Sequence, residues 1–304
     1  MARFSPVELQ ERMTSGLLSF PVTHTRTDYS LDEDGYREHL QWLGGHGAAA
    51  WFAAGGTGEF FALSLSEVRR VIELTVEERQ PETPVIAAAG YGTTMAVELA
   101  TSAEEAGADG ILLFPPYLTE VSQAGLYEHV SRVCTATGLG VTVYHRANAR
   151  FAAPTVERLA NEHENFIGIK DGVCDIDLLA RLRARVGDRL AYIGGLPTAE
   201  TYALPYQALG ASTYSSAIFN FLPEWAMSFY RSVRAGDTDD VHARLRDFVV
   251  PYLDIRDRNA GYAVAIVKAG MTAVGRSAGP VRPPLSDLTD EELADLTELV
   301  KKVA

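Results

Sequence analysis

The chain has 304 residues, of which 47% are hydrophobic and 22% are charged, close to the averages of globular proteins. Its 27 Lys and Arg residues against 40 Asp and Glu residues give a net charge of −13, which repels nucleic-acid backbones and anionic lipid surfaces at long range. We therefore expect neither nucleic acid nor a membrane as a partner, although local donors in a pocket can still bind an acidic small molecule.

The first sixteen residues, MARFSPVELQERMTSG, carry charges throughout and hold no apolar run of signal-peptide length. The expected location is therefore cytoplasmic. The chain has two cysteines, Cys134 in an expected helix and Cys174 just after an expected strand. Because two thiols cannot build a disulfide framework, we expect both to be reduced packing residues.

Short apolar or β-branched runs alternate with segments of helical periodicity from residue 16 to residue 235. Eight of these runs are predicted to be strands: 16–20, 48–53, 84–90, 110–114, 140–145, 166–170, 190–195 and 211–216. Several are apolar at consecutive positions, as strands buried on both faces are. The alternation predicts an α/β fold, a (β/α)8 TIM barrel over residues 1–235. An open doubly wound sheet is the alternative, disfavoured because no G-x-G-x-x-G turn follows the first strand.

Cap residues and prolines predict where the helices of this pattern begin. Helix starts are expected after Ser66, at Thr93 or Thr94, at Pro154 and after Pro197–Thr198. Beyond Phe221 the pattern is purely helical, and residues 236–304 are predicted to form a C-terminal helical extension packed on the barrel. The segment GPVRPPL predicts a sharp bend before the last helix.

Lys170 ends the apolar run FIGIK, and catalytic groups of such barrels lie at the C-terminal ends of strands. An apolar setting disfavours the ammonium and lowers the lysine pKa, which favours the free amine as a nucleophile. That chemistry is what imine formation requires. The alternative is a lysine at the solvent edge whose charged end extends into water.

Two further features lie at predicted strand ends. Tyr144 ends the preceding strand, where its phenol can relay protons during imine formation; the alternative is a packing tyrosine with a hydrogen-bonded tip. The run AAGGTGEF follows the second strand, and its backbone N–H groups with Thr57 can bind a carboxylate. An ordinary tight turn is the alternative there. For Glu59 we favour a structural role in orienting this loop.

Together, GGTGEF, VTVYHR and IGIKDG resemble the dihydrodipicolinate synthase/N-acetylneuraminate lyase family, in an order that fits about residues 10 to 300. The resemblance implies that Lys170 is a Schiff-base lysine, Tyr144 a proton-relay tyrosine, and Gly56 with Thr57 the binders of an α-keto carboxylate. Tyr117, in FPPYL, matches a tyrosine that many family members send into a neighbouring subunit. A homodimer or homotetramer is therefore implied.

Within the family, the segments AAGGTGEFFALS, YIGGLPTAETYALPYQALG and STYSSAIFNFLPE look most like the branch that dehydrates and decarboxylates a keto-sugar diacid. That branch usually reads Tyr-Asn-Arg-Asp-Asn where this chain has Tyr-His-Arg-Ala-Asn at 144–148, so the distal end of the pocket is expected to differ. Arg146 is retained and can hold a second carboxylate bidentately; the alternative is a surface arginine. Ser215 and Ser216, at the eighth strand end, are candidates to bind a substrate hydroxyl or are a structural turn.

No metal or cofactor is expected, because the seven histidines lack H-x-x-x-H spacing near a carboxylate base and the cysteines lack a partner. The expected ligand is a small keto-sugar diacid. Two other functions remain open at this point: an aldolase or synthase that uses the same imine, and a non-catalytic ligand-binding member of the family.

Overall fold

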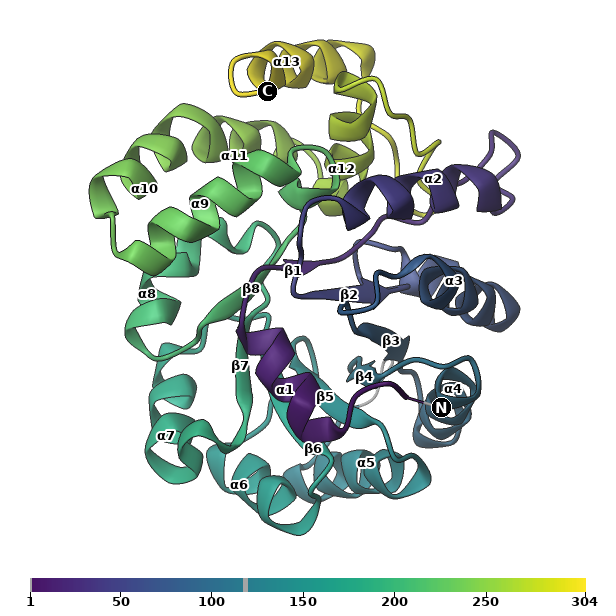
Figure 1. The fold of residues 1–304 in the computed structure, drawn as a ribbon, viewed down its shortest axis with the longest axis vertical. Coiled ribbons are helices and arrows are strands. Elements are labelled where there is room, and N and C mark those ends of the chain that lie inside the picture. Colours follow the sequence, from purple (N-terminus) through teal and green to yellow (C-terminus); the bar gives the residue numbers. More distant parts are fainter. Residues whose placement is uncertain (1, 117–119) are drawn as a thin grey trace.

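The computed structural model of the chain describes residues 2–116 and 120–304. Eight parallel strands pair in chain order and close on themselves, so the predicted (β/α)8 barrel is confirmed (Figure 1). The strands are β1 (Leu18–Ser19), β2 (Ala50–Ala53), β3 (Val85–Ala89), β4 (Gly110–Leu113), β5 (Gly140–His145), β6 (Phe166–Asp171), β7 (Ala191–Gly194) and β8 (Thr213–Ser216). The first strand is shorter than predicted, with only two residues paired to each neighbour.

Helices follow the strands and form the outer ring of the barrel. They are α2 (Glu33–Gly44), α3 (Leu65–Glu78), α4 (Thr93–Glu105), α5 (Gln123–Ala136), α6 (Ala153–Glu162), α7 (Ile176–Val186), α8 (Ala203–Ala208) and α9 (Pro223–Ala235). The predicted cap at Ser66 is wrong by two residues. The hydroxyl of Ser64 accepts from the Glu67 N–H, and the Glu67 side chain reaches back to the Ser64 N–H. This reciprocal pair satisfies two backbone donors, which a cap at 66 would leave open.

The N-terminal end of the barrel is plugged by α1 (Pro6–Thr14), which contacts β5, β6 and β7 (Figure 1). Leu9 on this helix is fully buried. A Cβ at Gly110 or Gly140 would come within 2.5 or 3.0 Å of the Leu9 Cδ2 atom. The glycines that begin β4 and β5 therefore make room for α1. Because α1 closes this end of the barrel, the opposite end is the open one.

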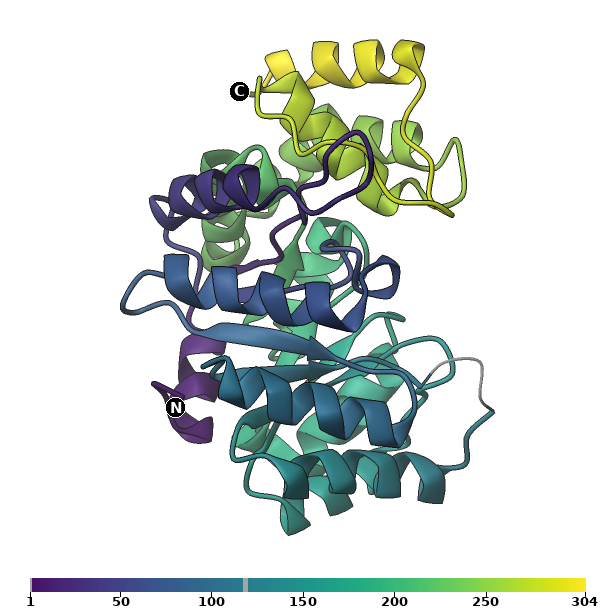
Figure 2. The ribbon, with the colours of Figure 1, turned by 90° about the vertical axis from the view of Figure 1, so that its right-hand side faces the viewer.

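The chain ends in α10 (Thr238–Arg244), α11 (Val250–Arg256), α12 (Tyr262–Ala273) and α13 (Asp290–Lys301), with a π-helical turn over Leu245–Val249. Figures 1 and 2 show α12 and α13 grouped at one side of the barrel, beside α2. Most buried apolar residues of these helices belong to the same hydrophobic core as the barrel, while Tyr262 and Ala265 of α12 form a small second cluster with Val281. Within the described part of the chain, none of the helices is long and apolar enough to cross a bilayer.

Candidate active site

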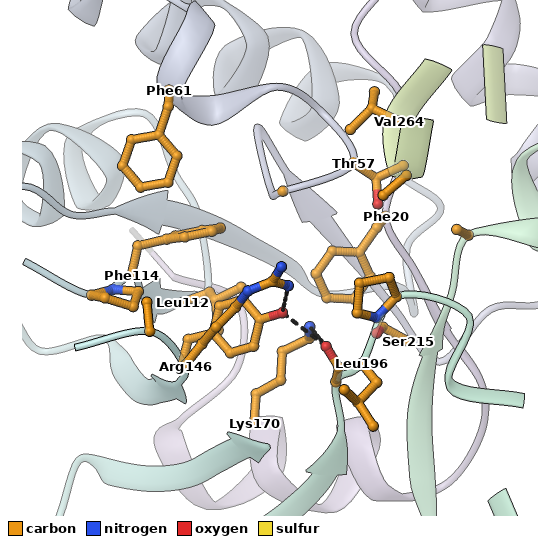
Figure 3. Close-up of a pocket in the computed structure, with 18 of the residues that line it drawn as sticks. Phe20, Thr57, Phe61, Leu112, Phe114, Arg146, Lys170, Leu196, Ser215 and Val264 are labelled. Carbon is orange, nitrogen blue, oxygen red and sulfur yellow. Dashed lines mark hydrogen bonds between the residues drawn. The ribbon is translucent and has the colours of Figure 1, made fainter. Parts of the chain in front are cut away.

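A cavity of about 660 Å³ opens at the C-terminal ends of the strands. It takes side chains from loops after most of the strands and from the start of α12 (Figure 3). Its described lining includes the predicted residues Gly56, Thr57, Tyr144, Arg146, Lys170 and Ser215, together with Phe20, Phe61, Leu112, Phe114, Glu120, Ala147, Asn148, Leu196, Pro197, Thr198, Ala263 and Val264. Most of the wall is apolar, which suits a ligand pocket with a few converging polar groups.

Lys170 lies at the bottom of this cavity, near the end of β6, with only 4% of its surface exposed. Its Nζ donates to the carbonyl oxygen of Gly195 at 3.1 Å and lies 4.0 Å from the centre of the Tyr144 ring. Burial lowers the pKa of Lys170, and the neighbouring Tyr144 acts in the opposite direction. Of the four lysines in the chain, Lys170 alone lines the cavity. The sequence prediction of a desolvated lysine is confirmed, and the solvent-edge alternative is wrong.

Tyr144 on β5 is paired in register with Lys170 on β6, which brings the two side chains together. The Tyr144 hydroxyl donates to the same Gly195 carbonyl at 2.8 Å and accepts from the Arg146 guanidinium at 2.9 Å. Burial alone would raise the pKa of Tyr144, but the positive charges of Lys170 and Arg146 outweigh burial and hold it below its ordinary value. A phenol with a lowered pKa beside an amine is suited to proton transfer.

Two glycines allow this arrangement. A Cβ at Gly172 would lie 2.5 Å from a carbon of the Tyr144 ring. A Cβ at Gly195 would lie 2.5 Å from Lys170 Cγ and 2.9 Å from its Nζ. The Gly195 N–H donates to the Asp171 carbonyl at 2.8 Å, which anchors the residue whose own carbonyl oxygen accepts from both side chains. Sequence reasoning missed Gly195, because a backbone acceptor leaves no signal in residue type.

Arg146 follows β5, and its side chain extends into the cavity to the Tyr144 hydroxyl (Figure 3). The adjacent Ala147 has φ +49°, a left-handed conformation that is uncommon for alanine. The Asn148 side chain donates to the Pro116 carbonyl at 2.8 Å, so the loops after β4 and β5 are tied together. Arg146 is thus an exposed loop arginine that also lines the cavity, with its guanidinium beside the Tyr144 hydroxyl.

The loop after β2 places Gly56 and Thr57 on the cavity wall, and Thr57 lies across the cavity from Lys170 (Figure 3). Gly56 is exposed and Thr57 is half-buried, and a Cβ at Gly56 would meet only Phe114, at 4.0 Å. The loop is closed by hydrogen bonds from the Glu59 and Phe60 N–H groups to the Gly56 and Gly55 carbonyls. Gly56 and Thr57 therefore face open space within the cavity, as a carboxylate-binding turn must.

The two serines that end β8 differ in direction, because successive side chains of a strand alternate between its two faces. Ser215 lines the cavity. Ser216 is fully buried outside it, donates to Glu200 Oε1 at 2.6 Å and accepts from the Phe219 N–H. The candidate role of Ser216 in binding a substrate hydroxyl is therefore corrected to a structural one.

Glu200, the partner of Ser216, is itself buried, and its Oε2 atom has no hydrogen-bond partner among the described residues. Burial raises the pKa of Glu200 from its ordinary 4.5 to about 7. Between these two values the unfolded chain loses the proton and the folded protein retains it. The stability that the neutral carboxyl contributes is therefore fully present below pH 4.5. It is lost as the pH rises through about 7, the pKa of Glu200 in the folded protein, and the total loss is about 3 kcal/mol.

We expect Glu200→Gln to remove this pH-dependent loss, because an amide stays neutral and can still accept from Ser216. Urea unfolding at pH 5 and pH 8 measures the effect. The variant should lose about 3 kcal/mol less stability than the wild type between these two values. Equal losses in the two proteins would show that Glu200 is already ionised in the folded state at pH 5.

The remaining sequence candidates are placed as follows. Tyr117 lies outside the described residues. His145 ends β5 and is buried, and its Nδ1 accepts from the Phe151 N–H at 3.1 Å. Cys134 is buried, Cys174 is partly buried, and both are free thiols. Over residues 2–116 and 120–304, no group of three His, Cys, Asp or Glu side chains is arranged to hold a metal ion.

Comparison with known proteins agrees with this geometry. A model of the Dihydrodipicolinate synthetase family matches residues 13–303, nearly the whole chain. The chain belongs to the dihydrodipicolinate synthetase family. The strand-end lysine, tyrosine and Gly-rich loop on which the sequence resemblance depends all line the cavity of this family member.

Relatives with curated names are similar over the full length. The chain is 61% identical to a Saccharopolyspora erythraea protein named "Probable 5-dehydro-4-deoxyglucarate dehydratase", over 100% of this chain and 98% of the relative. A Methylobacterium radiotolerans protein with the same name is 59% identical, over 99% of each chain. Among solved structures, dihydrodipicolinate synthase from Bacillus clausii is similar with a TM-score of 0.88 and 29% identity, over 97% of this chain and 99% of that one. The chain is therefore an enzyme by its family and its named relatives.

Proposed function

We propose that this enzyme converts 5-dehydro-4-deoxyglucarate to 2,5-dioxopentanoate, CO2 and water through a Schiff base on Lys170. The observation that carries the proposal is the buried Lys170 amine, in contact with the Tyr144 ring and facing a cavity large enough for a six-carbon diacid. Relatives at 54% to 61% identity carry the name of this dehydratase, which supports the substrate.

The first step is condensation of the Lys170 amine with the C5 ketone. Burial lowers the lysine pKa, so a larger share of the amine is neutral and nucleophilic than in water. Gly56 and Thr57 bind the carboxylate next to the ketone, and Arg146 binds the distal carboxylate as a charge-assisted pair. Tyr144 gives and receives the protons that convert the carbinolamine to the imine.

The protonated imine then acts as the electron sink for two bond cleavages. Loss of a C4 proton gives an enamine, and expulsion of the C3 hydroxyl as water leaves a conjugated iminium over C5, C4 and C3. Loss of the C1 carboxylate as CO2 sends its electron pair into this conjugated system. Protonation, tautomerisation of the C2 enol to the aldehyde and hydrolysis of the imine release 2,5-dioxopentanoate and regenerate the amine.

The test is to incubate the purified enzyme with 5-dehydro-4-deoxyglucarate and measure the release of CO2 and of the aldehyde product. After borohydride reduction, mass spectrometry measures the mass increase of the peptide that contains Lys170. We expect stoichiometric CO2 and aldehyde, and a reduced adduct on Lys170. Release of pyruvate without CO2 would instead indicate the aldolase alternative. No turnover and no adduct with this substrate or with other keto acids would favour a non-catalytic ligand-binding protein.

The proposal includes a homodimer or homotetramer in which Tyr117 of a second copy completes the proton relay. Sedimentation of the purified enzyme measures the assembly. A catalytically active monomer would remove Tyr117 of another copy from the mechanism.

For Tyr144→Phe we expect kcat to fall roughly a hundredfold with the fold retained, because the ring packing survives and only the proton-transferring hydroxyl is lost. The rate of adduct formation should fall with it, since imine formation is the step that the phenol serves. Stopped-flow trapping with borohydride measures that rate. An unchanged rate in the variant would remove Tyr144 from the mechanism.

A further inference from the structure

Lys268, on α12 of the C-terminal extension, is the second buried lysine of the chain and lies outside the cavity, with 2% of its surface exposed. Its Nζ lies 2.7 Å from Glu59 Oε1, and it donates to the Pro280 carbonyl at 2.9 Å and to Thr25 Oγ1 at 3.3 Å. The ammonium thus lies against three oxygen atoms, paired by charge with Glu59 and donating to Pro280 and Thr25. Its partners come from the loops after β1 and β2 and from the segment before α13.

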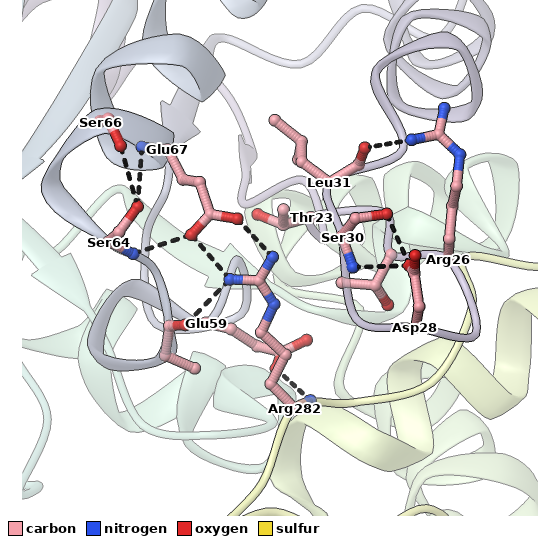
Figure 4. A network of polar contacts seen from close by, with 12 residues as sticks. Thr23, Arg26, Asp28, Ser30, Leu31, Glu59, Ser64, Ser66, Glu67 and Arg282 are labelled. Atoms are coloured by element: carbon pink, nitrogen blue, oxygen red, sulfur yellow. Dashed lines mark hydrogen bonds and ion pairs between the residues drawn. The ribbon is translucent and has the colours of Figure 1, made fainter.

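Glu59 is held from two directions by the extension. While Oε1 faces Lys268, Oε2 accepts from the backbone N–H of Arg282 at 2.9 Å. The Arg282 guanidinium continues to both carboxylate oxygens of Glu67, at 2.9 and 2.6 Å, and to the Ala62 carbonyl at 3.0 Å (Figure 4). The extension therefore contacts the end of the loop that carries Gly56 and Thr57, the segment that follows this loop, and the first turn of α3.

The loop that carries Gly56 and Thr57 needs such support because its backbone is strained. Ala54 and Glu59, on either side of Gly55–Gly58, have φ values of +52° and +60°, in the left-handed region that non-glycine residues rarely adopt. Conformations of this kind persist only where surrounding contacts impose them. On the barrel side the contact is Thr23 Oγ1 donating to the Gly58 carbonyl at 2.7 Å. On the other side it is the Glu59 carboxylate.

Stability alone is a weak explanation for a buried Lys–Glu pair. The cost of removing both charges from water consumes most of their attraction, and apolar residues of the same size often serve the fold equally well. A pair of this kind does fix geometry, because each charge has a single arrangement in which all its contacts are made. Here that geometry belongs to a loop on the cavity wall, two residues from Thr57.

We propose that Lys268 and Glu59 are positioning residues through which the C-terminal extension fixes Gly56 and Thr57 where they bind the α-keto carboxylate. The inference rests on the proposed function, because it presumes that these two residues contact that carboxylate. Neither Lys268 nor Glu59 touches the substrate. Their loss should weaken binding and leave the chemistry at Lys170 largely intact.

The test compares the wild type with the double variant Glu59→Gln/Lys268→Met, with Lys268→Arg and with the control Lys301→Met. The double variant replaces both charges by neutral side chains of similar length, so it buries no uncompensated charge. Lys301 is an exposed lysine in the last turn of α13. Two quantities are measured on each protein: KM and kcat for 5-dehydro-4-deoxyglucarate, and the pyruvate concentration that gives half-maximal borohydride-trapped adduct on Lys170.

In the double variant we expect KM and the half-saturating pyruvate concentration to rise about tenfold, with kcat within about threefold of the wild type. Lys268→Arg, which keeps the charge opposite Glu59, should return both quantities to within about threefold of the wild type, and Lys301→Met should change neither. A merely structural pair would not produce this split between KM and kcat.

Three results would overturn the inference: unchanged KM and half-saturation in the double variant, a fall in kcat at constant KM, or a double variant that does not fold by circular dichroism. The last result would show that the Lys268–Glu59 pair is needed for the protein to fold. A wild type that forms no adduct with either keto acid would refute the proposed function and this inference with it. A wild-type adduct with an unaffected double variant refutes the inference alone.

Discussion

Lys170→Met will abolish turnover, with a loss on the order of a thousandfold or more, because no other described group in the cavity can form an imine with the substrate ketone. Methionine is similar in length and apolar, so the position between the Tyr144 and Phe20 rings stays filled. Mass spectrometry after borohydride reduction should find an adduct in the wild type and none in the variant. The unfolding temperature of Lys170→Met should stay at or above that of the wild type, because the substitution removes a buried amine.

The other lysines provide controls for this result. Lys301 and Lys302 are exposed at the end of the chain, and Lys268 is committed to Glu59. Lys301→Met should retain the adduct, the turnover and the unfolding temperature. An adduct of full yield on Lys170→Met, at whatever lysine, would refute the assignment of Lys170 as the Schiff-base residue.

The barrel and the centre of its site could be predicted from the sequence for the same reason. Short apolar runs alternating with helical segments specify parallel strands buried on both faces, and the geometry of the barrel then brings every strand end to one rim. A lysine after FIGI and a tyrosine after GVTV are conspicuous in such runs. The rule places them on one rim, and the in-register pairing of Tyr144 with Lys170 makes them neighbours.

What the sequence could not supply was direction within a strand. In half-exposed strands, alternating polar and apolar residues reveal which face each side chain takes. In TYSS at the end of β8 both faces are buried and no such alternation exists. Ser215 and Ser216 therefore looked equivalent, although one lines the cavity and the other donates to Glu200.

Contributions from distant segments were also beyond sequence reasoning. Ala263 and Val264 reach the cavity from α12, at the far end of the chain from the Gly-rich loop they approach (Figure 3). Lys268 meets Glu59 across 209 residues of sequence. Small apolar residues and one lysine in a helix carry no pattern that distinguishes a cavity wall or an ion pair from ordinary packing. Only the docking of the extension on the barrel brings them there.

Gly195→Ala should lower turnover by at least a hundredfold, a large effect for one added methyl group. The new Cβ would lie 2.5 Å from Lys170 Cγ and 2.9 Å from its Nζ, closer than atoms in contact can approach. Either the lysine or the peptide must move. If the lysine moves, its amine leaves the position beside Tyr144. If the peptide moves, the carbonyl that accepts from both Lys170 and Tyr144 is displaced.

The same glycine-to-alanine change at Gly125 is the matched control. Gly125 lies exposed in the first turn of α5, and its Cβ would make only an ordinary contact of 3.5 Å with the Ser122 hydroxyl. Alanine there should leave kcat unchanged and favour the helix by about 0.5–1 kcal/mol. Because the Gly195 clash acts on the nucleophile, the rate of adduct formation should fall together with kcat. Normal adduct formation in Gly195→Ala would mean that the loop after β7 yields freely and that its carbonyl does not hold the reacting pair.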